Sequence, residues 1–317
     1  MRAGAHALSL LASPLNVHVL QALAEGPSSL IDLRRAIGSP PQTTMRGHMR
    51  TLAQLGVLER RRHTEFPGSV DYELGSAGRD LIAVNEVVRA WLSRSPDGPV
   101  QPGSVAAKSA IKALTEGWSS MIVRALAAKP LSLTELNRLI SDLNYPSLER
   151  RLGAMRLARQ IEPRPNGSRS TPYVATEWLR RAIVPLAAGA RWERKHAPAE
   201  SAPIGRLDIE SAFLLGIPML RIPPELSGTC RLAVDIRGAE EHRFAGVATA
   251  VEEGRVVSCI SRLQGNADAW ATGTAAAWMR AVFQREPDNL EIGGDADLAN
   301  ALIDGLHGAL LGMGERR

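Results

Sequence analysis

The chain has 317 residues, of which 44% are hydrophobic and 22% are charged, as is ordinary for a globular protein with two or three domains. No stretch approaches the roughly 18 consecutive apolar residues that a membrane-spanning helix needs. The two cysteines, Cys230 and Cys259, cannot form a disulfide framework. We therefore expect a cytoplasmic protein without a membrane partner, and we interpret residues 1–20 as an amphipathic helix of the fold rather than a signal peptide.

The net charge of +5 is unevenly distributed along the chain. Residues 1–200 contain 27 Lys and Arg against 17 Asp and Glu, a net charge of +10. Residues 201–317 contain 11 against 16, a net charge of −5. A basic front part favours a polyanionic partner, and an acidic rear part does not.

Two stretches rich in Pro, Gly and Ser have the composition of linkers, residues 93–104 and 196–205. They divide the chain into three predicted domains, which we call segment 1 (1–93), segment 2 (105–195) and segment 3 (205–317). The overall fold class is expected to be α+β and mainly helical.

Segments 1 and 2 are predicted to be tandem copies of one plan. Residues 22–37 align without a gap with residues 125–140, a shift of 103. After a two-residue loss in the next loop the shift becomes 101, which aligns Tyr72 with Tyr173. Each copy is expected to contain two helices, a short helix, an amphipathic helix, a β-hairpin and a long helix.

Within segment 1, residues 39–62 predict a capped amphipathic helix. Ser39 and Gln42 fit a capping box, Pro40 suits the first helical turn, and Gly56 suits a helix stop. Apolar residues recur at helical spacing on one face, namely Met45, Met49, Leu52 and Leu55.

The next stretch, residues 57–74, predicts a basic β-hairpin with its tip near Pro67-Gly68, so that helix and hairpin together make a helix-turn-helix with a wing. A helix fits the major groove, arginine can bond guanine edges, and a basic hairpin can neutralise phosphates. The residues expected to read bases are Thr43, Arg46, Gly47 and Arg50, and those expected to hold phosphate or minor groove are Arg60, Arg61 and Arg62. The alternative is a packed helix with a solvated basic face.

These residues carry a family resemblance. Segment 1 resembles the winged-helix repressors of the HxlR, MarR and PadR group, most closely the HxlR type, in LRRAI (33–37), MRTLAQLGVLERR (49–61) and VDYELGSAGRDL (70–81). It departs from the pattern where Gly75-Ser76 replaces the usual Thr-Pro. The resemblance implies a regulator that binds double-stranded DNA. Many members sense oxidants through a cysteine near the N-terminus, but this chain has none before Cys230, so that mode is not implied.

Segment 2 is similar but degenerate on its recognition helix. Glu149 stands where segment 1 has Arg46, and Gly153 stands where it has Arg50. The cations of this copy expected to contact DNA are Arg150, Arg164 and Arg169. Family members usually bind palindromic sites as homodimers, so two copies in one chain suit a single-chain pseudo-dimer as well as a homodimer. Alternatively, segment 2 has become an interaction module.

Segment 3 changes character, with β-rich runs at 230–236, 245–251 and 254–263 followed by helical patterns at 275–284 and 296–312. Through its motifs AWATGT and LEIGGDADLANAL it resembles the sterol-carrier-protein-like fold. The resemblance implies an apolar tunnel for a fatty acyl or sterol-like effector. The expected lining residues are Phe213, Leu214, Ile217, Met219, Trp278, Met279, Val282 and Phe283. Alternatively, these side chains simply fill a core.

No motif of catalysis accompanies these features: no glycine-rich phosphate loop follows a strand, and neither HExxH nor GxSxG occurs. We expect no enzyme activity, no cofactor and no metal. The sequence therefore predicts a DNA-binding transcriptional regulator with a hydrophobic effector. The alternative is a carrier of hydrophobic ligands whose winged helices are scaffold or dimer contacts, but a carrier needs no basic front part.

Overall fold

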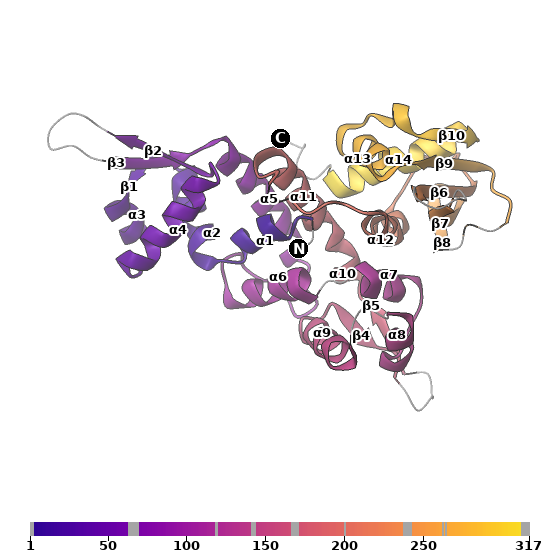
Figure 1. Cartoon of the computed structure of the whole chain (residues 1–317), viewed down its shortest axis with the longest axis horizontal. Coiled ribbons are helices and arrows are strands. Elements are labelled where there is room, and N and C mark those ends of the chain that lie inside the picture. Colours follow the sequence, from indigo (N-terminus) through magenta and orange to yellow (C-terminus); the bar gives the residue numbers. More distant parts are fainter. Residues whose placement is uncertain are drawn as a thin grey trace. The chain divides into compact units, whose positions relative to one another are not determined.

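The computed structural model describes residues 3–62, 70–117, 120–140, 144–165, 171–199, 201–236, 243–261, 263 and 265–311 (Figure 1). They fall into two compact units. Unit 1 contains residues 1–115 and 185–202, and unit 2 contains residues 116–184 and 203–317. The units do not follow the three segments, because the two ends of segment 2 belong to unit 1 and its centre belongs to unit 2.

The main part of unit 1 is a winged helix formed by segment 1. Its helices are α1 (Ala5–Leu11), α2 (Pro14–Ala24), α3 (Leu30–Ala36), α4 (Gln42–Gln54) and α5 (Ser76–Leu92). Its antiparallel sheet has the order β1-β3-β2, with strands β1 (Ser28–Ser29), β2 (Leu58–Arg62) and β3 (Val70–Leu74). The core is built from fully buried side chains that include Leu8, Leu20, Leu33, Met45, Leu52, Leu81 and Leu92.

Helix α5 begins directly against the junction of α4 and β2. A Cβ at Gly78 would lie 2.2 Å from the carbonyl oxygen of Val57, and one at Gly75 would lie 2.3 Å from that of Gly56. The N–H of Gly75 also donates to the carbonyl oxygen of Val57 at 3.0 Å. Glycine at these positions therefore allows α5 to hold the end of α4 and the start of the wing in place.

Two helices of segment 2 also belong to unit 1: α6 (Val105–Gly117) up to Thr115, and α11 (Ile183–His196) from Pro185 onward. The buried carboxylate of Glu193 accepts hydrogen bonds from the N–H groups of Gly4, His6 and Ala7 at 2.8, 2.8 and 3.0 Å. It thereby satisfies donors at the first turn of α1, which has no side-chain cap of its own.

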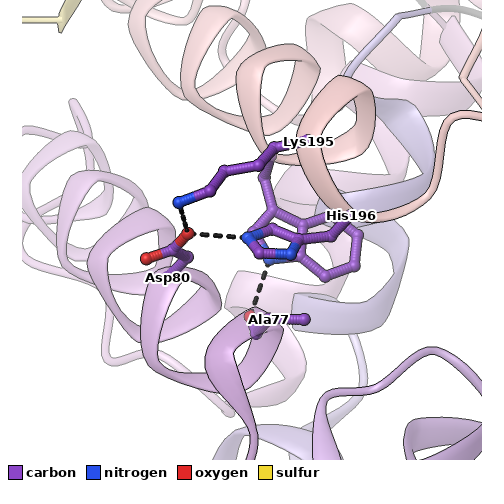
Figure 2. A network of polar contacts seen from close by, with 5 residues as sticks. Ala77, Asp80, Lys195 and His196 are labelled. Carbon is purple, nitrogen blue, oxygen red and sulfur yellow. Dashed lines mark hydrogen bonds and ion pairs between the residues drawn. The ribbon is translucent and has the colours of Figure 1, made fainter.

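The C-terminal end of α11 makes a second set of polar contacts with α5 (Figure 2). The indole Nε1 of Trp192 donates to the carbonyl oxygen of Ala77 at 2.8 Å. Lys195 Nζ and His196 Nε2 lie 2.7 and 2.6 Å from the same Asp80 Oδ2. Burial by itself raises the pKa of Asp80, but the hydrogen bonds from Lys195 and His196 outweigh it and hold that pKa below the ordinary value of 3.8.

The centre of segment 2, in unit 2, has the same order of elements as segment 1. It consists of α7 (Ser120–Ala128), α8 (Leu133–Leu139), α9 (Tyr145–Leu157), β4 (Ile161–Pro163), β5 (Tyr173–Ala175) and α10 (Glu177–Arg181). Its strand register follows the same offsets, because Leu131 bridges Tyr173 where segment 1 pairs Ser28 with Tyr72. Segment 2 differs in its last helix, which breaks at Ala182 shortly before Pro185, a residue that cannot continue the helical hydrogen bonding.

Segment 3 forms a five-stranded sheet of order β10-β9-β6-β7-β8, antiparallel except for the parallel pair β6–β9. The strands are β6 (Gly228–Ile236), β7 (Arg243–Glu252), β8 (Arg255–Ile260), β9 (Ala269–Gly273) and β10 (Glu291–Gly294). The helices are α12 (Arg206–Gly216), α13 (Ala275–Gln284) and α14 (Ala296–Leu311), with short 3₁₀ turns at Ile217–Met219 and Pro287–Asn289. The sequence patterns did not predict α12, which precedes the strands.

Segment 3 and the centre of segment 2 are joined by ion pairing and hydrogen bonding within unit 2. Arg124 Nε on α7 lies 2.8 Å from Oε1 of Glu210, a side chain of α12 that is 1% exposed. Burial raises the pKa of Glu210, and Arg124 opposes that shift only in part. Arg180 donates to the carbonyl oxygens of Leu214 and Ala127, both at 3.3 Å.

Among the described residues, no single helix is both long and apolar enough to cross a membrane. Helices α1 and α2 taken together, across a bend of 79°, meet the requirements of length and composition.

Candidate nucleic-acid interface

Helix α4 is amphipathic in the predicted sense. Met45, Met49 and Leu52 are at most 2% exposed and face the core, and Gly56 ends the helix with φ of 67°. The N–H of Val57 then donates to the carbonyl oxygen of Leu52 at 2.9 Å, a bond of the kind that closes a glycine-terminated helix.

The predicted cap at Ser39 is wrong. Helix α4 starts at Gln42, its N-cap is Pro41, and no side chain caps it. Two consecutive prolines keep the preceding residues out of the helical conformation, so the helix starts later than the capping pattern indicates. Ser39 instead has φ of 55° and donates its N–H to the carbonyl oxygen of Arg34.

The outward face of α4 presents the predicted base-reading residues to solvent. Thr43, Arg46, Gly47 and Arg50 are all exposed. No neighbouring atom lies within 4 Å of a Cβ built on Gly47, so the backbone there is open to close approach from outside. Within the described part of the chain, neither Arg46 nor Arg50 forms an ion pair with a carboxylate.

A groove of about 610 Å³ lies between α4 and the wing. Its lining residues are Leu30, Arg46, Met49, Arg50, Ala53, Gln54, Arg60, Val70 and Tyr72. Among these lining residues of the described part of the wing and α4, three are arginines and none is acidic. Arg60 and Tyr72 are direct cross-strand partners, and the guanidinium carbon of Arg60 lies 5.9 Å from the ring centroid of Tyr72, within the range of a cation–π contact. Sequence patterns alone assign no role to Tyr72, because only the hairpin register places it beside Arg60.

The wing presents further cations. On β2 only Leu58 is buried, and the side chains from Glu59 to Arg62 are exposed. Arg62 lies on the same face of the hairpin as Arg60 and is available to an external anion, whereas Arg61 lies on the opposite face, directly across from Asp71 on β3. The predicted tip at Pro67-Gly68 lies outside the described residues.

In segment 2, Arg150 on α9 and Arg164 after β4 are exposed, and Arg169 lies outside the described residues. At the positions that match the three groove arginines of segment 1, segment 2 has Glu149, Gly153 and Pro163.

The eight predicted ligand-lining residues lie on α12, α13 and the 3₁₀ turn between α12 and β6. Phe213, Leu214, Ile217, Trp278 and Val282 are buried, whereas Met219, Met279 and Phe283 are half-buried. Phe213 and Trp278 pack edge to face with ring centroids 4.7 Å apart, and the indole of Trp278 donates to the carbonyl oxygen of Ala233 at 2.7 Å. Their role in binding a ligand stays a prediction.

The two cysteines lie on strands β6 and β8, which are separated by β7. Cys230 on β6 pairs with Thr249 on β7, which pairs with Cys259 on β8. Burial raises the pKa of each thiol to about 12, so both are protonated at neutral pH.

Comparison with known proteins finds a family that is similar to the winged helix of segment 1. Residues 10–97 match the HxlR-like helix-turn-helix family. This region runs from the last two residues of α1 to beyond the end of α5, so the winged helix of unit 1 is similar to the HxlR-like helix-turn-helix domain, which points to a DNA-binding transcriptional regulator.

Two similar solved structures are both of YodB from B. subtilis. The diamide-treated form is 28% identical, covering 28% of this chain and 88% of that chain, with a TM-score of 0.27. The reduced form of this transcriptional regulator is 25% identical, covering 25% and 78%, with a TM-score of 0.24. No curated protein sequence matches the chain.

Proposed function

We propose that the chain is a sequence-specific DNA-binding transcriptional regulator whose reading domain is segment 1. The observation that carries this proposal is the groove between α4 and the wing, where Arg46, Arg50 and Arg60 gather and none of the described lining residues is acidic. Like charges held together repel one another, and an anionic partner relieves that repulsion. The sugar-phosphate backbone beside a major groove is such a partner.

In this proposal α4 enters the major groove. Thr43, Arg46 and Arg50 bond base edges, and Gly47 lets the helix backbone approach the DNA closely. The wing arginines neutralise phosphates, so binding weakens steeply as salt is raised.

Segments 1 and 2 are proposed to be a tandem duplication that forms a pseudo-dimer within one chain. The shared order of elements and the equivalent pairings Ser28–Tyr72 and Leu131–Tyr173 support the duplication. The presence of α6 and α11 in unit 1, with α11 hydrogen-bonded to α1 and α5, supports pairing within the chain in place of pairing between chains.

Segment 3 is proposed to bind a hydrophobic effector, a role that rests on its resemblance to sterol-carrier-like domains. Because Arg124–Glu210 and Arg180 tie α12 to segment 2, a ligand that shifts α12 would also act on segment 2. Isothermal calorimetry of palmitate and cholesterol binding to the full chain tests the proposed effector binding separately from DNA binding.

The DNA-binding proposal is tested by fluorescence anisotropy with the DNA upstream of the protein's own gene, a scrambled duplex and a salt series. We expect a preference of about a thousandfold for the upstream DNA. Arg46→Ala with Arg50→Ala should reduce that preference by about 100-fold, since each bidentate arginine–guanine contact contributes about 1–3 kcal/mol.

The matched control is Arg89→Ala with Arg94→Ala, which also removes two exposed cations of unit 1 but lies outside the groove. It should lower the affinity for both duplexes slightly and leave their ratio unchanged. Equal, weak binding of the wild-type chain to both duplexes would refute the proposal and favour the carrier function.

A further inference from the structure

We infer that base sequence is read by segment 1 alone, so that each bound chain recognises one sequence-defined half-site rather than both halves of a palindrome. The inference rests on the proposed DNA-binding function. It adds that the DNA site bound by one chain has a defined base sequence in only one of its two halves.

The first observation is that segment 2 lacks all three arginines of the reading groove. The offsets of 103 and 101 residues that align the elements and strand pairs of the two segments also align their groove residues. At the positions of Arg46, Arg50 and Arg60, segment 2 has Glu149, Gly153 and Pro163. Tyr72, the cross-strand partner of Arg60, has its equivalent in Tyr173. The strand pairing of the hairpin is therefore shared, whereas the positive charge of Arg60 is lost.

The second observation concerns what replaces the polar side chains. At the positions of Gln42 and Gln54, which flank the reading face, segment 2 has Tyr145 and Leu157. Leu157 is 82% exposed and Tyr145 is 46% exposed. The aliphatic side chain of Leu157 offers no hydrogen bond to a base edge or to a phosphate, whereas the hydroxyl of Tyr145 can still form one.

The third observation concerns the remaining charges of α9. Glu149 is exposed at the position where segment 1 has Arg46, and a carboxylate at this place is repelled by the phosphates on both sides of a groove. Segment 2 gains three arginines on α9, Arg150, Arg151 and Arg156, at the positions of Gly47, His48 and Ala53. Nη2 of Arg150 lies 3.4 Å from Oγ of Ser147 on the same helix. The exposed Arg150 and Arg156 suit contact with phosphate, which positions a protein but carries no sequence information.

The physical consequence is an asymmetric site. Base-edge contacts that distinguish sequences contribute about 1–3 kcal/mol per base pair, whereas phosphate contacts strengthen binding to every sequence alike. A chain with one reading helix and one basic but non-reading helix therefore specifies one half-site and tolerates any sequence beside it.

The test is selection of duplexes from a randomised library by the full chain, followed by single-base substitution in the selected site and by native mass spectrometry of the complex. We expect one non-palindromic element per bound chain. Substitutions within it should weaken binding by about 5–150-fold, and substitutions on the other side should change affinity less than twofold.

Two double variants, each checked for an unchanged melting temperature, assign the element to a segment. Arg46→Ala with Arg50→Ala should reduce the sequence preference by about 100-fold while salt-sensitive binding remains. Arg150→Ala with Arg156→Ala should weaken binding to selected and scrambled duplexes equally and leave their ratio unchanged.

An inverted repeat whose two halves are both required by a single bound chain would overturn the inference, as would a tenfold or larger fall in the preference ratio with the segment 2 variant. Either result would leave the DNA-binding function standing. An inverted repeat occupied by two chains would support the inference, because each chain would then read one half. Failure to select any sequence would refute the proposed function itself.

Discussion

The carboxylate of Glu193 accepts a hydrogen bond from the backbone N–H of Gly4, 189 residues earlier in the chain. The start of α1 and helix α11 pack closely at this point: a Cβ added to Gly4 would lie 2.3 Å from the carbonyl oxygen of Leu186. A residue of segment 2 thus completes the first turn of α1 in segment 1. The positions of segment 1 that match Gly189 and Glu193 are Val88 and Leu92, so the contact has no equivalent in the reverse direction.

Replacement of Glu193 by alanine should destabilise unit 1. It would leave three backbone donors, those of Gly4, His6 and Ala7, without their acceptor in a buried environment. We expect a loss of about 3 kcal/mol in the free energy of unfolding, measured by urea denaturation, because buried donors left unsatisfied cost about 1–3 kcal/mol each and local rearrangement recovers a part. Glu177→Ala, which removes an exposed glutamate paired with Arg181, is the control and should cost less than about 1 kcal/mol. Equal effects of the two substitutions would contradict this role of Glu193.

Acid should weaken the contact between α5 and α11 through Asp80. The pKa of this carboxyl is lowered in the folded protein, so its contribution to stability is present above the unfolded value near 3.8 and is lost as pH falls through the lower folded value. The contribution is on the order of 0.5 kcal/mol, because the side chain is 43% exposed and solvent screens its ion pairs. Urea denaturation of wild type and Asp80→Asn between neutral pH and pH 3 measures it. The difference in stability between the two should shrink as pH falls, and a difference that grows toward low pH would show that the sign is wrong.

Gly47→Ala should separate stability from DNA binding. Alanine is favoured over glycine in a helix interior by about 1 kcal/mol, and a Cβ at position 47 meets no protein atom within 4 Å. The variant should therefore unfold at a higher urea concentration while its affinity for specific DNA falls, because the added methyl group obstructs close approach in the major groove.

The matched control is Gly153→Ala on α9, where a Cβ also meets nothing within 4 Å. It should raise stability by a similar amount and leave sequence preference unchanged. An undiminished affinity of Gly47→Ala for the selected duplex would exclude close backbone approach at this residue.

Oxidants should leave DNA binding unchanged in this chain. With the pKa of both thiols raised to about 12, Cys230 and Cys259 react slowly as nucleophiles at neutral pH. They also lie two strands apart, about 10 Å at the usual strand spacing, which is too far for a disulfide. Iodoacetamide labelling followed by mass spectrometry should be slow in the native protein and fast in urea. Rapid native labelling, or loss of DNA binding after diamide treatment, would contradict this expectation.

Features that depend on neighbouring residues could be predicted from the sequence. The apolar spacing of Met45, Met49 and Leu52 defines the buried face of α4, and Gly56 ends the helix, because helix periodicity and glycine termination are local properties. The exposed arginines of α4 follow from the same periodicity. Even here a local rule failed at Ser39, where two prolines and the contact of Arg34 with the carbonyl oxygen of Pro40 outweigh the capping pattern.

Contacts between residues of different elements are decided by the tertiary structure, because the periodicity of a single segment does not encode them. Arg60 joins Arg46 and Arg50 in one groove only because the hairpin folds back beside α4 and places Tyr72 opposite Arg60. Glu193 caps α1 only because α11 packs in unit 1, and sequence periodicity does not encode a partner 189 residues away. The sequence determined which residues face inward or outward in each element, since this depends on local geometry, whereas the residues that meet across elements depend on how the whole chain closes around its cores.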